Sequence, residues 1–182
     1  ALQADGQFLD LECDALQKYT RTLDMKRGVL EQNIKWRLSN GTNIRLVSER
    51  LVSMEKQHLA GIHWQLSADA DCDIVLSSAL DAAVNNRFAD THFGDVTVND
   101  NAISITTIQE KHQAMVMMRH TVDIPDYTAK QAKHSMKCEE HYHFSLKTGQ
   151  LATIDKFIVV YDSRFSDGDL EQLCSQEIDD AH

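Results

Sequence analysis

The chain has 182 residues, enough for one domain that buries about two thirds of its unfolded surface. Lys and Arg total 18 and Asp and Glu total 28, which gives a formal net charge of −10. That charge repels nucleic-acid phosphates and anionic lipids, no basic patch offsets it, and no apolar run approaches the ~18 residues of a membrane span, so neither nucleic acid nor a membrane is expected as a partner.

The first elements are predicted strands. Residues 7–11 form a short strand after the turn signal Asp5-Gly6, and residues 15–23 lead on from it at an edge. Apolar and polar residues alternate over 30–38, and residues 44–52 continue in an extended pattern. Between these two strands, Asn40-Gly41 predicts the tight turn of an antiparallel hairpin, with positive φ at both central residues.

Further strands follow along the rest of the chain. The pattern predicts strands at 60–66, 74–80, 95–99, 102–108, 115–122, 141–146 and 151–161, with a loop at 81–91. Asp100-Asn101 predicts a second hairpin, and the turn 147–150 predicts a third between the last two strands. Residues 125–138 are polar and are interpreted as a long loop or a short helical turn.

The chain ends in one predicted helix. Asp167-Gly168-Asp169 can cap its start, and Leu170, Leu173, Cys174 and Ile178 recur at helical spacing over 169–178. This apolar stripe is expected to lack its natural cover. The fold class is therefore all-β, a large antiparallel β-sandwich over residues 1–166 with a short C-terminal helix.

Several segments carry a resemblance to a known family. In the first third of the chain they are Leu23 to Leu30, Trp36, Ser48 to Ser53 and His58; later they are Ser78 to Asp81 with Asn85, Met118 to Val122, and Asp155 to Arg164. In this order they resemble the N-terminal domain of glycoside hydrolase family 65, the maltose, trehalose and kojibiose phosphorylases.

The resemblance implies a super-sandwich of the galactose-mutarotase type, followed at 167–182 by the start of a helical linker to an (α/α)6 catalytic barrel. It implies phosphorolysis of an α-glucoside with inversion, in which a glutamic acid of the barrel protonates the leaving oxygen. No catalytic, cofactor-binding or metal-binding residue is carried over to this chain. Inorganic phosphate and a disaccharide are the expected co-substrates of the whole enzyme. The expected protein partners of this chain are the barrel and a second subunit.

Two clusters of potential ligands could form a metal site within this chain. Glu139, His141 and His143 share one strand face with Cys138 nearby, which permits a zinc site, but a fourth ligand is missing and solvent-facing strand residues are favoured. Asp69-Ala70-Asp71-Cys72-Asp73 begins like a calcium loop, yet it lacks the required Gly and the bidentate carboxylate, so an acidic loop is favoured.

Two aromatic residues and four arginines also invite functional hypotheses. Trp36 and Trp64 could stack on a sugar, but their alternation with polar neighbours favours core packing. Arg27, next to Gly28, either pairs with Asp24 to fix a corner or reaches a phosphate or sugar, and the structural reading is favoured. The same alternatives apply to three further arginines, Arg50, Arg119 and Arg164.

Two other functions stay open: a stand-alone carbohydrate-binding module and a mutarotase-type sugar epimerase. A binding module requires exposed aromatic residues in a groove, whereas an epimerase requires a Glu and a His that face a groove. A support domain requires an apolar patch where a neighbouring domain docks. Cys13, Cys72, Cys138 and Cys174 are widely spaced, which favours reduced thiols in the cytoplasm over a disulfide framework. The sequon Asn40-Gly41-Thr42 is explained by the turn.

Overall fold

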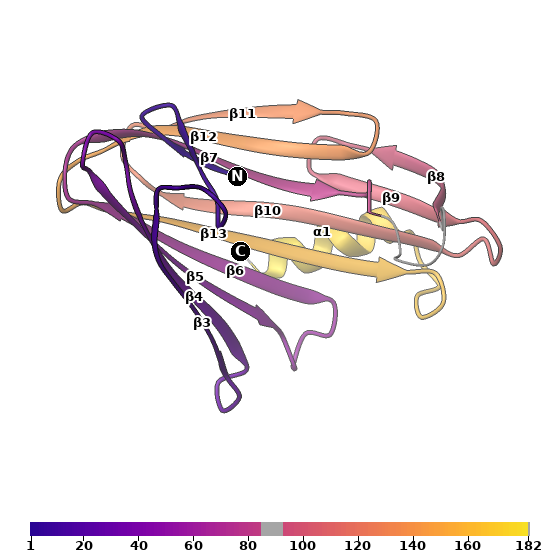
Figure 1. Ribbon diagram of the computed structural model, residues 1–182. Helices are drawn as coiled ribbons and strands as arrows, with labels where there is room; N and C mark the ends of the chain where they lie inside the picture. Colours follow the sequence, from indigo (N-terminus) through magenta and orange to yellow (C-terminus); the bar gives the residue numbers. More distant parts are fainter. Residues whose placement is uncertain (85–92, 182) are drawn as a thin grey trace.

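The computed structural model of the chain describes residues 1–84 and 93–181 and consists of two antiparallel sheets that pack face to face, with one helix outside (Figure 1). This confirms the predicted all-β sandwich. Residue Asn85 and most of the predicted loop 81–91 lie outside the described residues.

The two sheets differ in size. The smaller has five strands in the order β11-β12-β7-β1-β2, with bounds β11 Thr128–Lys133, β12 Lys137–Leu146, β7 Cys72–Asp81, β1 Leu2–Ala4 and β2 Gln7–Leu9. The larger has eight strands in the order β3-β4-β5-β6-β13-β10-β9-β8, with bounds β3 Leu16–Asp24, β4 Val29–Arg37, β5 Asn43–Val52, β6 Leu59–Ala68, β13 Leu151–Asp162, β10 Gln113–Asp123, β9 Ala102–Thr107 and β8 Phe93–Val98. The first long strand, β3, lies at an edge as expected.

The hairpin of β4 and β5 forms as predicted, with Trp36 opposite Ile44, but its turn differs. Five residues, 38–42, connect the strands, and of the two central residues only Gly41 has a positive φ, at 93°. The Asn40 side chain accepts a hydrogen bond from the Thr42 amide at 3.0 Å, so Asn40 shapes the loop through its side chain rather than through a left-handed backbone.

The prediction of a hairpin between 141–146 and 151–161 is wrong. β12 pairs with β7 in the smaller sheet, whereas β13 pairs with β6 in the larger one. The turn 147–150 therefore carries the chain from one layer to the other, and the connection between β6 and β7 does the same. Alternation identifies both strands but carries no information on their partners.

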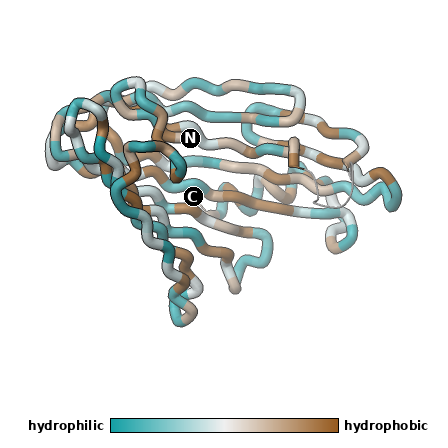
Figure 2. The backbone as a smooth tube through the Cα atoms, in the orientation of Figure 1, coloured by the Kyte–Doolittle hydropathy of each residue, from teal (hydrophilic) through white to brown (hydrophobic). Residues whose placement is uncertain are grey.

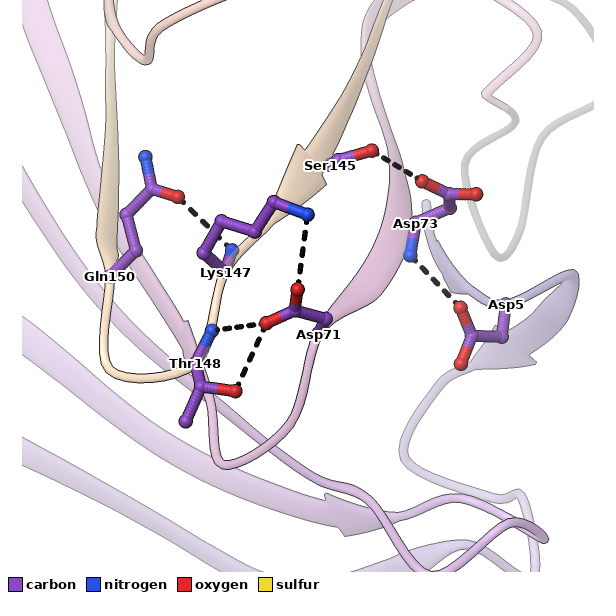
Figure 3. Close-up of polar contacts among 7 residues, drawn as sticks. All are labelled: Asp5, Asp71, Asp73, Ser145, Lys147, Thr148 and Gln150. Carbon is purple, nitrogen blue, oxygen red and sulfur yellow. Dashed lines mark hydrogen bonds and ion pairs between the residues drawn. The ribbon is translucent and has the colours of Figure 1, made fainter.

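The acidic segment 69–73 ties these two crossings together (Figure 3). Asp71 accepts hydrogen bonds from the amide and the hydroxyl of Thr148, at 2.8 and 3.0 Å, and pairs with the Lys147 ammonium at 3.0 Å. The Thr148 amide is the main cause of a lowered pKa at Asp71, with Lys147 adding to it. Asp73 accepts from the Ser145 hydroxyl and donates its amide to Asp5. Residues 69–71 thus form an acidic loop as predicted, whereas Cys72 and Asp73 already belong to β7.

Residues 125–138 are not a loop or a helical turn. Thr128–Lys133 is β11, an edge strand that pairs with β12, and β12 begins at Lys137. Five of the six residues of β11 are exposed, so neither face has the apolar alternation that would have revealed a strand.

The core lies between the sheets, where the even-numbered residues of β4, β7 and β12 meet. Figure 2 shows hydrophobic and hydrophilic stretches interspersed along the strands, as expected where one face of a strand is directed to the core and the other to solvent. The side chains that define this core include Ala4, Trp36, Ile44, Leu66, Ile74, Phe144, Leu146 and Ile154. Trp36 is 2% exposed and donates its indole N–H to the Asp10 carbonyl at 2.7 Å, which confirms its core assignment.

The predicted helix is α1, Leu170–Ala181, and the expectation that its stripe lacks cover is wrong. Cys174 and Ile178 are fully buried against Met115, Met117 and Val159. These odd-numbered partners point away from the smaller sheet, so the helix covers part of the outer face of the larger sheet. Within the described residues, no helix combines the length and hydropathy needed to cross a bilayer.

We predict that Ile178→Ala lowers the free energy of unfolding by roughly 2 to 5 kcal/mol, because it leaves a cavity under the helix. The exposed Gln176→Ala on the same helix is the matched control and should change little. Urea unfolding of both variants measures this. Equal stability of the two would mean that α1 does not pack on the sheet in solution.

Candidate functional site

The described part of the chain holds a cluster of polar side chains between the two sheets. His120 of β10 is the centre, with its side chain 1% exposed. Its Nε2 lies 2.8 Å from the Ser78 hydroxyl of β7, and its Nδ1 lies 2.8 Å from a carboxylate oxygen of Glu140 on β12. The Tyr142 hydroxyl donates to Glu140 as well, and the Gln131 amide donates to its other oxygen at 3.0 Å.

These contacts fix the charge of Glu140. Burial alone would raise the pKa of this carboxyl, but His120, Tyr142 and Gln131 together outweigh burial and lower it to about 2. Burial and the adjacent carboxylate raise the pKa of Tyr142. Glu140 is therefore an ionised hydrogen-bond acceptor, and Tyr142 a neutral donor, throughout the physiological range.

A buried amine lies beside this cluster. Lys156 of β13 is opposite His120 in the register and donates to the Ala79 carbonyl of β7 at 2.7 Å. Burial lowers its pKa to about 8. Like His120, Lys156 thus connects the larger sheet to the smaller one.

The sequence contains a signal for this cluster in the phase of its strands. Glu140 falls between the inward positions of Cys138 and Tyr142, and Lys156 falls between those of Ile154 and Ile158. A charged residue in the apolar phase of a strand indicates a buried polar contact. Because His120 is almost fully enclosed, we assign the cluster a role in joining the sheets rather than in binding a substrate.

The residues considered for a metal do not assemble one. Glu139, His141 and His143 do share a face, but Cys138 is buried on the opposite face of β12. Glu139 pairs with Lys137, which is the main cause of its lowered pKa, and with His141 at 3.1 Å. Across residues 1–84 and 93–181, no three His, Cys, Asp or Glu side chains are grouped to hold a metal ion.

A groove of about 330 Å³ lies between the inner face of β4 to β6 and the edge formed by β1 and β2. Trp64, half-buried, and Arg50 line it, and Arg50 has no ion-pair partner within the described residues. Ser48 also lines the groove, and its buried hydroxyl has no hydrogen-bond partner among the described residues. Trp64 is thus less enclosed than the core assignment predicted.

A second pocket, of about 210 Å³, lies on the outer face of the larger sheet. Two cross-strand pairs are among its lining residues. Arg27 and Glu49 are 3.3 Å apart, and His63 Nδ1 lies 2.6 Å from Asp155. We name it the outer pocket.

The arginines have mainly structural contacts. Asp24 accepts from the backbone amides of Lys26 and Arg27, so it fixes the corner without binding the Arg27 guanidinium, which pairs with Glu49 instead. Gly28, next to Arg27, has a positive φ of 67°, a conformation that glycine adopts readily. Two of the other arginines also form ion pairs, Arg119 with Asp179 and Arg164 with Asp162.

Comparison with known proteins identifies this combination of sandwich and outer helix. The model of glycosyl hydrolase family 65, N-terminal domain, matches residues 1–182. The chain belongs to this family. A 1,2-alpha-glucosylglycerol phosphorylase of Bacillus selenitireducens is 22% identical over 89% of this chain and 21% of its own length. A maltose phosphorylase of Bacillus subtilis is 26% identical over 90% of this chain and 22% of its own.

The fold agrees with that of the family 65 domain. A solved structure, described as a putative kojibiose phosphorylase from human microbiome, superposes with a TM-score of 0.83 at 19% identity, over 99% of this chain and 24% of the other. The chain thus spans less than a quarter of the length of each of these three proteins.

We predict that stability falls as the pH drops from about 5 to about 2 and that Glu140→Gln flattens this dependence. The folded pKa of Glu140 lies below its unfolded value, so its contribution is complete above the unfolded pKa and is lost as the pH falls through the folded one. Urea midpoints at several pH values measure it. An unchanged acid slope in Glu140→Gln would show that this carboxylate is not held by the cluster.

We also predict that Trp36→Ala costs roughly 3 to 5 kcal/mol of unfolding free energy and Trp64→Ala clearly less, because the Trp36 side chain is almost fully buried whereas that of Trp64 is only half-buried. Denaturant unfolding without any sugar tests both. Equal losses would place Trp64 in the core, as the sequence suggested.

Proposed function

We propose that the chain is the non-catalytic N-terminal domain of an inverting α-glucoside phosphorylase that acts on a maltose-type disaccharide. In this proposal residues 1–166 are the supporting sandwich, and residues 167–182 begin the linker to an (α/α)6 catalytic barrel. The observation that carries it is the match of the N-terminal family model to residues 1–182, together with phosphorylase relatives that are more than four times as long.

The chemistry explains why the sandwich needs no catalytic group. Inverting hydrolysis uses an acid and a base that activates water from the opposite face of the sugar. Phosphate already carries its negative charge, so phosphorolysis requires an acid and an anion pocket but no separate base. We assign both to the barrel. In this chain the buried Glu140 and His120 contact each other and Ser78, Tyr142 and Gln131, which supports a structural role.

The proposal extends to location and assembly. All four cysteines are free thiols, and Cys72, Cys138 and Cys174 are buried, which supports a cytoplasmic enzyme. Phosphate is its co-substrate, no cofactor is required, and a homodimer is the proposed assembly.

One observation favours a second candidate, a carbohydrate-binding module. Trp64 lines the same groove as Arg50, which has no ion-pair partner among residues 1–84 and 93–181, and an indole with a hydrogen-bond donor beside it suits a sugar. Titration with maltose, followed by Trp fluorescence, tests this candidate: saturable binding that Trp64→Ala removes, without loss of fold, would favour it over the support role.

We predict that the purified 182-residue chain produces no β-glucose 1-phosphate above background from maltose, trehalose or kojibiose with phosphate. The acid and the anion pocket are proposed to lie on the barrel, so positioning and charge stabilisation are both missing. The positive control is the longer protein that contains these residues.

Two outcomes would contradict the proposal. Turnover by the 182-residue chain that survives extensive purification would place a catalytic site within it and direct attention to Glu139, His141 and His143. Absence of phosphorolysis by the longer protein, with all three disaccharides, would reject the phosphorylase assignment itself.

A further inference from the structure

The outer face of the larger sheet is only partly covered. Helix α1 packs on β13 and β10, where Leu59 and Phe157 border its buried side. These two residues also line the outer pocket, so the apolar surface continues beyond the helix toward β4 and β5. The outer pocket is therefore the uncovered extension of the surface on which α1 lies.

Two hairpin ends extend this surface with apolar side chains. The connections β3–β4 and β5–β6 project away from the smaller sheet at the bottom of Figure 1. Met25 in the first is 86% exposed and Met54 in the second is 96% exposed, and Leu51, which lines the outer pocket, is 45% exposed. Apolar side chains that gather on one exposed surface indicate an interaction site.

The path of the chain brings the end of α1 to the same place. The Lys56 ammonium, in the β5–β6 connection, donates to the carbonyl of Asp180 at 3.3 Å. Arg119 of β10 pairs with Asp179 of the helix. The last turn of α1 is thereby held beside the loop that carries Met54.

The pocket is shaped for a mixed partner. Its floor includes Leu51, Leu59 and Gly61, and a Cβ at Gly61 would meet only the Lys156 carbonyl and Leu51, at 3.9 and 4.0 Å. The pairs Arg27–Glu49 and His63–Asp155 add polar and charged side chains to the pocket. The exposed fractions of these four side chains lie between 30% and 57%. An apolar anchor flanked by polar residues fits such a surface.

We infer that the outer pocket and the tips at Met25 and Met54 form the docking surface for the polypeptide that follows residue 182 in the longer enzyme. This inference rests on the proposed function, because that function supplies the downstream polypeptide. The phosphorylase relatives are more than four times as long as this chain, so the proposed enzyme has a large downstream segment that could cover the surface. Because α1 ends beside the surface, this segment begins within reach of it. Covalent connection makes this partner favoured over a second copy.

Amide hydrogen exchange in the 182-residue chain and in the longer protein tests the inference. Exchange at residues 53–59 should slow by about tenfold or more in the longer protein, because docking covers a loop that is open in the shorter chain. The double variant Leu51→Thr/Met54→Ser should restore fast exchange in the longer protein and leave the unfolding midpoint of the 182-residue chain unchanged. Phe8→Ser, an exposed apolar residue of β2 in the smaller sheet, is the matched control and should alter neither.

The outcomes separate this inference from the function on which it rests. Equal exchange at 53–59 in a longer protein that carries out phosphorolysis would overturn the docking surface and leave the proposed function standing. Slowed exchange in a longer protein without phosphorolysis would support the surface and reject the function. A third outcome would assign the surface to a second copy and overturn the inference. In that case, protection of residues 53–59 from hydrogen exchange would rise with the concentration of the 182-residue chain, and sedimentation would show a dimer that Met54→Ser abolishes.

Discussion

The larger sheet has two faces that must be covered, and this constraint determines the rest of the structure. Its inner face carries alternating apolar residues of its central strands, and the five-stranded sheet packs on them to form the main core. Its outer face carries a second apolar cluster around Met115, Met117 and Val159, which α1 buries with Cys174 and Ile178. What neither layer covers is the outer pocket with the hairpin tips. The arrangement therefore accounts for the sandwich, the position of the helix and the proposed interface by one physical requirement.

Polar contacts determine how the two layers are aligned. At one end, Asp71 binds Lys147 and Thr148 and holds together the two connections that cross between the sheets. In the interior, the contacts of Glu140 with His120 and of Lys156 with the Ala79 carbonyl link strands of opposite sheets. A buried charge is costly when it lacks a partner and contributes little net stability when it has one, so these contacts specify a unique alignment more than they increase stability. The apolar interior supplies the stability.

The sequence revealed most strands because alternation is a local property. The hairpin of β4 and β5, the hairpin at Asp100-Asn101 and the C-terminal helix were predicted from the pattern and are confirmed. The assignment of strands to the two sheets was not predicted correctly. The pattern indicated a hairpin of β12 and β13, but these strands lie in different sheets. β11 was missed because its side chains are exposed on both faces, and the burial of the α1 stripe because Met115 and Met117 come from a strand about 60 residues earlier. Of the polar residues in the interior, Glu140, Lys156 and His120 could have been found from their inward phase, but the contacts that they make could not.

We propose that this domain supports a catalytic barrel and does not itself hold the reacting groups. A crystal structure of the longer protein with phosphate and a disaccharide bound tests it most directly. We expect the acid and most donors to the phosphate to come from residues after 182, while Glu140 and His120 remain enclosed between the sheets. A phosphate held by Arg27 in the outer pocket or by Arg50 in the groove, next to the bound sugar, would contradict it.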